Sequence, residues 1–565
     1  MGNCYLQYNS KVYILGREWV LIGGRFNKKI IADVVVLEII RMAGYATEEK
    51  EIIRHIGKKY SMSDDKVLDI LNTLVEKGFL IKNHIKVPTQ NYAMDSRKIE
   101  YMGIITCERE QALKKSLGSY IRNAQKNAHD ITYVVIDDSS HNAQCSNINT
   151  IKYIAQEQCC KVGYMGFKER KKMVDLLCQH TTVSREIILY AFLPNMTEKW
   201  KDILFTAGAA RNCLNAVSPY DKYIVIDDDS LPLGNYSERE RKIAFSQGQG
   251  IAEHHYGIGD RLSNANIDLI ELNNMYLGKK LKQILSNIQE VNINDYANDT
   301  KILLDQLDIY KESNIAVTTN TIQGIRDISV DTLLFSEQEK NTNWYIEKMK
   351  ADYICSNPFL LTTTATGIDP IYFKIPFIPI CRNEDVITGM IFNFLDGFAL
   401  GVSINSNLTH AKAGGYTAIK NSQSNFYEEI LYPILLKNIL LKMQMNVPNV
   451  ILPISKKIAI FKQYIVAVCG KSSKEMFSNI TSMNSTIMEV CFAKIQEIKS
   501  PRKEKWSYVS TYPDSIDEIL KSKKLADFRN MLLDYVELLE AWEELLHGCN
   551  KIKEKELFPI TIYGT

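Results

Sequence analysis

The chain has 565 residues, and 68 Lys and Arg face 66 Asp and Glu, so its formal net charge is only +2 at pH 7. This balance argues against a protein whose main ligand is nucleic acid, because such proteins carry a strongly basic surface. Apolar residues make up 45% and aromatic residues 10% of the chain, which is typical of a folded globular protein and excludes a disordered one.

Cysteine usage and hydropathy predict a cytoplasmic protein. The twelve cysteines are scattered without C-x-x-C spacing, which favours reduced thiols over a zinc site or a disulfide framework. Neither a signal peptide nor an apolar run long enough to span a bilayer is found, so we expect no transmembrane segment. The length predicts about two to four domains.

Residues 1–86 read as a small separate unit. Short strands are expected at Lys11–Leu15 and Glu18–Ile22, followed by three helical patterns. The first helical pattern carries Ile31, Val34, Val35, Ile39 and Ile40. The third begins after Ser63 and ends at Gly78. The three patterns therefore predict a helical layer beside a small sheet.

This unit resembles the winged-helix-like leader-peptide recognition element of the pyrroloquinoline-quinone chaperone type, which accompanies enzymes that modify ribosomally made peptides. The resemblance implies that a leader peptide adds a strand between residues 25–30 and the helix at 64–76. The alternative is a winged helix used for dimerisation or DNA binding. Four acids on the third helix argue against DNA, because phosphates would repel them: Asp64, Asp65, Asp69 and Glu76.

Residues 87–99 form a polar connector, and strands then alternate with helices over residues 100–425. This alternation predicts an α/β domain with a mostly parallel sheet. Three apolar strands end in polar residues, at Thr106, at Asp138 and at Asp227. Because ligands bind at the carboxyl ends of parallel strands, we expect these side chains to share one site.

Three consecutive acids, Asp227, Asp228 and Asp229, follow the strand that begins at Tyr223. Their mutual repulsion and lost hydration require a cation or a set of donors. Closely spaced oxygen ligands suit Mg²⁺ or Mn²⁺, held together with substrate phosphates. An acidic loop capped by Ser230 is the alternative.

Further motifs occur in a fixed order along residues 101–416. They are Thr106-Cys-Glu-Arg109, Ile136-Asp-Asp-Ser139, Ala210-Arg-Asn212, the Asp triplet, Glu384-Asp385 and His410. In this order they resemble the inverting GT-A glycosyltransferases of the family-two type. The chain departs from that pattern at Glu108, where Asn is usual.

The resemblance implies a role for each motif. Nucleotide-sugar binding, with a UDP-hexose as the default donor, is expected at Thr106, Arg109, Asp138, Arg211 and Asp228, whereas Asp137 is expected to be structural. Mn²⁺ or Mg²⁺ is expected at Asp227, Asp229 and His410. Asp385 is expected to be the general base, with Glu384 supporting it. The acceptor side is expected at Thr364, Gly367 and Arg382, within and after the segment 362–367.

Two regions carry no site motif. Residues 260–350 have Leu at helical spacing and are predicted to form a helical insertion that shapes the acceptor side. Residues 426–565 are predicted to form a helical domain, with an amphipathic stripe that runs from Leu525 to Leu546. This domain is expected to hold the recognition unit or to make a homodimer.

Three hypotheses follow. The first is a glycosyltransferase that modifies a ribosomally made precursor peptide captured through its leader. The second keeps the enzyme and assigns a cell-wall, capsular polysaccharide or lipid-linked acceptor. The third is a regulatory protein that binds a nucleotide sugar without turnover.

Overall fold

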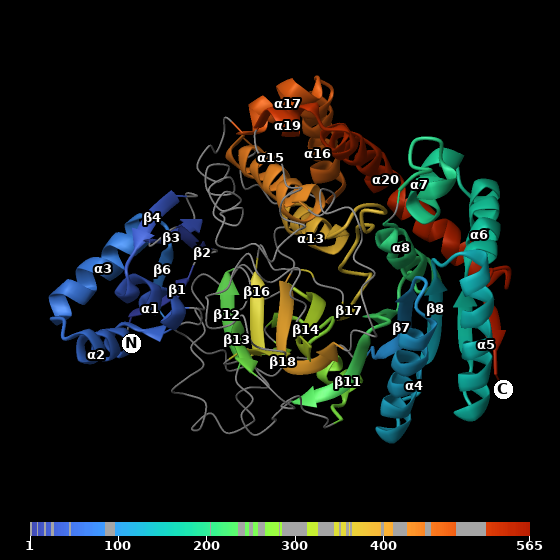
Figure 1. Ribbon diagram of the computed structural model, residues 1–565, viewed down its shortest axis with the longest axis horizontal. Helices are drawn as coiled ribbons and strands as arrows, with labels where there is room; N and C mark the ends of the chain where they lie inside the picture. The colour runs from blue at the N-terminus through green and yellow to red at the C-terminus, as the bar shows by residue number, and fades with distance from the viewer. Residues whose placement is uncertain are drawn as a thin grey trace, which may run out of the picture.

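The computed structural model describes most of the chain, and all structural statements below concern the described residues. These are 3–7, 10–15, 18–23, 28–43, 47–84, 97–203, 205–235, 243–247, 252–257, 266–281, 283–284, 313–325, 344–349, 352–356, 361, 364–396, 400–410, 426–446, 454–481 and 516–564. Figure 1 shows a small N-terminal module on the left, a large sheet in the centre, and helices above and to the right of the sheet.

The N-terminal module contains two small antiparallel sheets and three helices. Strands β2 (Ser10–Leu15), β3 (Glu18–Gly23) and β4 (Lys28–Ala32) form one sheet, in which β4 pairs with β3. Strands β1 (Asn3–Gln7), β5 (Thr47–Glu48) and β6 (Leu80–His84) form the other. The helices are α1 (Val34–Met42), α2 (Glu49–Tyr60) and α3 (Asp64–Glu76).

The two predicted strands and the third helix of this module are confirmed. Helix α3 ends just before Gly78, whose φ of +79° is a left-handed conformation that glycine adopts without strain. The prediction for the first helix was wrong at its start, because Ile31 lies in β4 and the helix begins at Val34. Residues 25–27 of the expected peptide groove lie outside the described residues.

The described part of the large sheet has 13 strands, and its parallel core has the order β9-β8-β7-β10. Strands β7 (Ile99–Thr106), β8 (Thr132–Asp137), β9 (Val162–Met165) and β10 (Lys222–Asp227) run parallel to their neighbours. The chain moves outward from β7 to β9 and then returns to the other side of β7 to form β10. The strand order therefore reverses between β7 and β10.

The sheet is mixed, so the prediction of a mostly parallel sheet was wrong for its second half. Strand β17 (Ala365–Ile368) is antiparallel to β10 and to β14 (Ile315–Ile325), and β14 is parallel to β18 (Leu400–His410). A strand buried on both faces reads as an apolar run whichever way it points. Strands β11 (Ser230–Asn235) and β16 (Asp352–Ser356) pair with β18, and β12 (Ile243–Gln247) pairs with β16. Strand β15 (Trp344–Met349) pairs with β14 and with β13 (Ala252–Gly257).

The described parts of the predicted helical insertion at 260–350 contain strands as well as a helix. Helix α9 (Leu269–Asn274) lies in this segment. Strands β14 and β15 of the same segment belong to the large sheet. Leu269, Leu277 and Leu281 are buried in the core cluster that includes residues of the sheet. Residues 260–265, 285–312 and 326–343 of the predicted insertion lie outside the described residues.

Helices cover both faces of the parallel core. Helices α4 (Glu110–Lys126) and α5 (His141–Glu157) pack on one face, and α6 (Phe167–His180), α7 (Arg185–Phe192) and α8 (Ala207–Val217) belong to the core on the other face. Gly103 of β7 permits the close packing of α8, because a Cβ there would lie 2.3 Å from Leu214. This approach brings the amino end of α8 to the carboxyl edge of the sheet.

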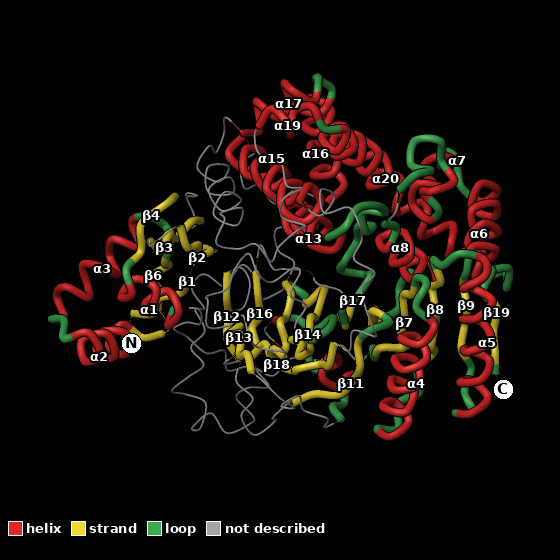
Figure 2. The backbone as a smooth tube through the Cα atoms, in the orientation of Figure 1, coloured by secondary structure: helices red, strands yellow, loops and turns green. Residues whose placement is uncertain are grey.

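The C-terminal helices are α15 (Tyr432–Asn446), α16 (Ile454–Cys469), α17 (Ser473–Thr481), α19 (Ile516–Lys521) and α20 (Lys523–Glu554), preceded by the π-helical turn η6 (Phe426–Leu431). The stripe predicted on α20 is buried except for Leu546, which is partly buried. Helix α20 packs against α6, α7 and α8, and β19 (Thr561–Tyr563) pairs with β9. These helices therefore share one hydrophobic core with the sheet. Figure 2 shows them as red tubes above and beside the yellow strands of the sheet.

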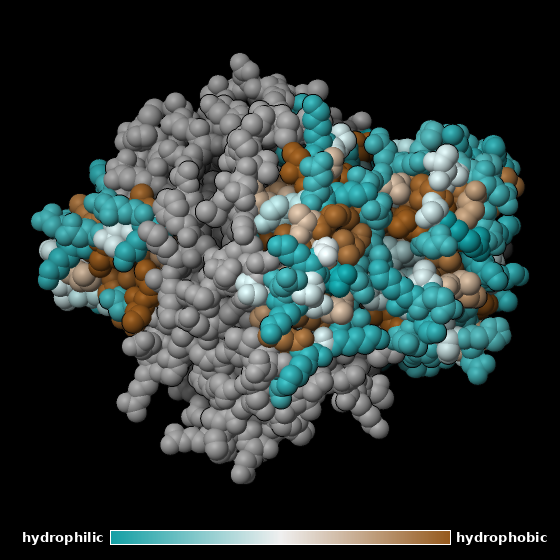
Figure 3. Space-filling view, turned by 90° about the horizontal axis from the view of Figure 1, so that it is seen from above, coloured by the Kyte–Doolittle hydropathy of each residue, from teal (hydrophilic) through white to brown (hydrophobic). Residues whose placement is uncertain are grey.

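Polar side chains predominate over the right-hand end of the molecule, where α6, α7 and α20 lie, with apolar groups gathered between them (Figure 3). Among the described residues, no helix combines the length and the apolar character that crossing a membrane requires.

Replacement of Trp542 by Ala is expected to lower the free energy of unfolding by about 3–5 kcal/mol, because the indole is buried beside Phe192 in the shared core. Urea unfolding followed by tryptophan-independent circular dichroism measures the change. The neighbouring exposed Glu543→Ala variant serves as the control and should stay close to wild type. If α20 unfolded in a separate transition, and only that transition moved to lower urea concentration in the variant, the shared core would be contradicted.

Candidate functional site

The candidate site lies at the carboxyl edge of the sheet, where the strand order reverses between β7 and β10. Ile105 of β7 is the register partner of Asp227 on β10, and Thr106 is the partner of Asp137 on β8. Ligands of open α/β sheets bind at such a reversal, because the loops after the two strands diverge and leave a crevice. The polar residues that follow three separate strands are therefore brought to one edge, as the sequence predicted.

Two of the three consecutive acids are buried and held by cations of the chain. The carboxylate of Asp228 accepts a hydrogen bond from Thr106 Oγ1 at 2.6 Å and pairs with Arg109 Nη2 at 2.5 Å. Asp229 pairs with Arg109 Nη1 at 2.8 Å and with His410 Nε2 at 3.1 Å. Arg109 thus bridges the two acids, and His410 reaches them from the end of β18.

The third acid, Asp227, links the triplet to the Glu384-Asp385 motif. Arg211 at the start of α8 pairs with Asp227 at 3.1 Å and also forms an ion pair with Glu384, the first residue of α13 (Glu384–Leu395). The side chain of Asp227 remains 30% exposed, so it faces the open side of the site. Arg211 therefore joins two motifs that are more than 150 residues apart in the sequence.

Burial and neighbouring charges, including that of Asp385, set the pKa values of the three acids. Burial raises the pKa of Asp227 to about 6; Arg211 opposes the rise, and the negative charges of Asp229 and Asp385 add to it. Burial also raises the pKa of Asp228 to about 7, against the opposing charge of Arg109. Burial acts in the same direction on Asp229, but His410 and Arg109 outweigh it and lower the pKa of that carboxyl to about 2.

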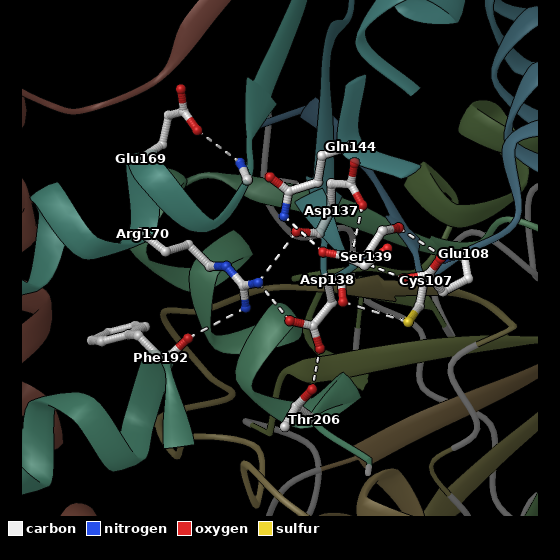
Figure 4. Close-up of polar contacts among 12 residues, drawn as sticks. Cys107, Glu108, Asp137, Asp138, Ser139, Gln144, Glu169, Arg170, Phe192 and Thr206 are labelled. Atoms are coloured by element: carbon white, nitrogen blue, oxygen red, sulfur yellow. Dashed lines mark hydrogen bonds and ion pairs between the residues drawn. The ribbon is translucent and has the colours of Figure 1, made fainter. Parts of the chain in front are cut away.

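Asp138 lies in a second polar cluster, with Arg170 and Thr206 (Figure 4). Its carboxylate pairs with Arg170 Nη2 at 2.5 Å and accepts a hydrogen bond from Thr206 Oγ1. Asp137 points into the fold, where it accepts hydrogen bonds from Ser139 N at 3.0 Å and from Tyr164 Oη at 3.1 Å. Asp137 is thus bound by the protein itself, in agreement with the structural role predicted for it.

Sequence reasoning missed Arg170. This residue is only 2% exposed and lies on the apolar face of α6, where Met173, Val174 and Leu177 continue the same helical spacing. A cation at a position that periodicity assigns to the core needs a buried acid nearby, because an unpaired buried charge is very costly. That pattern was the signal available in the sequence.

The departure at Glu108 has a local explanation. Glu108 adopts φ of +57°, a left-handed conformation in which Asn is more readily accepted than most residues. Its N–H donates to Ser139 Oγ at 2.7 Å, and its carboxylate accepts from Ser140 N at 2.5 Å. The Glu side chain therefore ties the first motif to the second.

The residues predicted for the acceptor side are not all at the site. The carbonyl of Thr364 accepts the N–H of Asp227 at 3.2 Å, and Arg382 lies over the ring of Phe205 at 5.5 Å from its centroid. Gly367 pairs with Ile224 inside the sheet, and a Cβ there would lie 2.3 Å from Thr318 Oγ1. Close packing therefore requires this glycine. Residues 362 and 363 lie outside the described residues.

The acidic edge fits a divalent cation only in part. Within the described ranges, no three side chains of His, Cys, Asp or Glu are gathered in a geometry that would hold a metal ion. Asp227 and Asp229 supply carboxylate oxygens at one edge, and Mg²⁺ in such sites is held by one or two carboxylates plus substrate phosphates. Asp229 would have to exchange Arg109 or His410 for the ion, because both now contact its carboxylate.

Comparison with known proteins identifies no family. No family model matches the chain, and a search of curated proteins found no matching relative.

Replacement of Arg170 by Met is expected to lower the free energy of unfolding by about 3–5 kcal/mol, because it leaves the Asp138 carboxylate without its buried cation. Chemical denaturation measures the loss. The double variant R170M/D138N should recover most of it, since no unpaired charge then remains. Arg185→Met, which breaks an exposed ion pair with Asp175, is the control and should cost little. A loss in R170M that the second substitution does not reduce would contradict the pairing.

Proposed function

We propose that the protein is a metal-dependent inverting glycosyltransferase with a GT-A domain, which moves a sugar from a nucleotide-sugar donor to a ribosomally made precursor peptide. The observation that carries the proposal is the double pairing of Arg211, which brings Asp227 and Glu384 together beside the reversal of strand order. The acids proposed to bind the donor phosphates and the proposed base next to Glu384 would then lie at one edge of the sheet. A single displacement at the anomeric carbon requires the two to be close.

The donor side of the proposed reaction is assigned from the two polar clusters. Asp138, held by Arg170 and Thr206, would accept a hydrogen bond from the nucleotide base, and Thr106 would lie beside the ribose. Mn²⁺ or Mg²⁺ at Asp227 and Asp229 would neutralise the negative charge of the departing diphosphate. Arg109 and His410 are close enough to Asp229 to contact the same phosphates once they release its carboxylate.

The base is assigned to Asp385 because the resemblance to family-two-type enzymes implies it, and the pairing of the adjacent Glu384 supports this choice. Glu384 is buried and paired with Arg211, so its charge is already used within the protein. Asp385 is partly exposed and acts electrostatically on Asp227. Asp385 would remove the proton of the acceptor hydroxyl or thiol as that group attacks the anomeric carbon. One base and no carboxylate nucleophile imply inversion at that carbon.

Leader recognition is assigned to the open edge of the N-terminal sheet. Within the described part of the module, β4 pairs with β3 on one side only. Ile31 on β4 is 65% exposed, and Val34 at the start of α1 is 58% exposed. An extended peptide that added to this edge would satisfy the backbone of β4 and cover both apolar side chains. Because β1 of the module contacts β12 of the large sheet, a bound leader would hold the core peptide near the enzyme at a high effective concentration.

Asp229→Ala and Asp385→Asn are expected to abolish transfer, with Asp385→Asn lowering kcat by about 10²–10⁴-fold through loss of the base. Intact-mass measurement of a co-expressed neighbouring small peptide, with a hexose increment as the readout, tests the reaction. Removal of divalent metal with a chelator should stop transfer, and added Mn²⁺ should restore it.

Asp175→Asn, on the exposed face of α6, is the matched control and should transfer at the wild-type rate. Full transfer by both site variants would overturn the assignment. Loss of transfer to peptide with retained transfer to a polysaccharide or lipid-linked acceptor would favour the second hypothesis, and nucleotide-sugar binding without any turnover would favour the regulator.

Ile31→Glu is expected to weaken leader binding by at least about tenfold, because a charge replaces an exposed apolar group beside the strand edge. Fluorescence anisotropy of a labelled precursor peptide with the full-length protein gives the dissociation constant. Ile562→Glu, at a similarly exposed isoleucine of β19, serves as the comparison and should bind normally. Equal affinities in the two variants would leave the β4 edge without a role.

A further inference from the structure

The loop that carries Glu384 and Asp385 has an unusual backbone. Cys381 and Asn383 both adopt left-handed conformations, with φ of +80° and +62°. Left-handed residues other than glycine are strained, and two within three positions persist only where the surroundings fix them. Arg211 holds the Glu384 side chain, but it does not contact the strained residues themselves in any described interaction.

Glu428 supplies a contact to this backbone. Its side chain is 3% exposed, and Oε2 accepts the N–H of Arg382 at 2.9 Å, between the two left-handed residues. Glu428 lies in the π-helical turn η6, a rare conformation that often occurs at functional sites. The carboxylate therefore stabilises the loop at its most strained point.

The other oxygen of Glu428 connects the loop to the C-terminal helices. Oε1 pairs with Lys524 Nζ at 2.8 Å, in the first turn of α20. That turn is fixed in its own right, since the carbonyl of Lys524 accepts the hydroxyl of Tyr432 at 2.6 Å and Ser522 caps the helix. Burial raises the pKa of the Cys381 thiol well above its usual range, and the negative charges of Glu428 and Asp385 add to the rise.

We propose that Glu428 is a positioning residue, which fixes the 381–385 loop against the start of α20 and thereby aims the Asp385 carboxylate into the site. The role of Asp385 rests on the proposed function, whereas the support of the loop does not. The C-terminal helices carry no site motif, but they support the loop through the buried carboxylate of Glu428, which joins Lys524 to Arg382. Loss of this support lets the loop relax and displaces the base while donor binding at Asp138 and Asp229 is retained.

Two readouts on the full-length protein test the proposal in Glu428→Ala. Hydrogen exchange of the segment around Arg382 should become faster by about tenfold or more, because its amide loses a charge-assisted hydrogen bond. The kcat for sugar transfer should fall on the order of 100-fold, as expected for a misplaced catalytic group, with less than about a twofold change in UDP affinity.

Glu428→Gln should recover roughly tenfold of the lost kcat, because its amide oxygen still accepts the Arg382 N–H while the charge is gone. This variant also keeps the test valid if Glu428→Ala fails to fold. Glu540→Gln, which alters an exposed ion pair between α20 and Lys462, is the matched control and should match wild type in both readouts.

Unchanged exchange in Glu428→Ala would overturn the proposal, and so would faster exchange with an unchanged kcat. If only Glu428→Gln folds, a kcat equal to that of the wild type would overturn it. An equal loss of UDP affinity and kcat would indicate general structural damage and would also overturn it. A wild-type protein that transfers no sugar at all would instead overturn the proposed function, while the exchange readout would still decide whether Glu428 holds the loop.

Discussion

The repulsion among carboxylates at one edge of the sheet is the constraint on which the site depends. Asp227, Asp228, Asp229 and Glu384 are brought close together, and an apolar sheet and buried helices limit their access to water. Uncompensated, such a cluster would destabilise the fold. Arg109, Arg211 and His410 offset it, and each comes from a different element. The same contacts that keep the protein folded therefore also define which side chains meet a ligand.

The two polar clusters differ in how their carboxylates are paired. Arg109 bridges Asp228 and Asp229 with the two ends of one guanidinium. Burial raises the pKa of Asp229, but His410 and Arg109 outweigh it and lower that pKa to about 2, so this carboxyl is ionised at neutral pH. Asp138 is different, because Arg170 is buried behind it and has no open side from which to be displaced.

Much of the parallel half was predictable from the sequence, since apolar strands that end in polar residues mark the carboxyl edge directly. The stripe on α20 was predictable as well, because helical periodicity reports burial whatever the partner is. Strand direction after β10 was not, because a strand covered on both faces carries no sign of its direction. Arg170 and Glu428 were missed for a related reason: each is a buried charge whose partner lies on another element. The apolar spacing of α6 marks Arg170 as buried, but no local pattern identifies a partner across the fold.

The pairing of β19 with β9 has a consequence for synthesis of the protein. The two strands are separated by almost 400 residues, and α20, which leads to β19, covers the face formed by α6, α7 and α8. While a ribosome is still translating the middle of the chain, that apolar face and the free edge of β9 have no cover. We expect the nascent protein to need a chaperone over this interval, and its final closure to be slow, since contacts so distant in sequence form late.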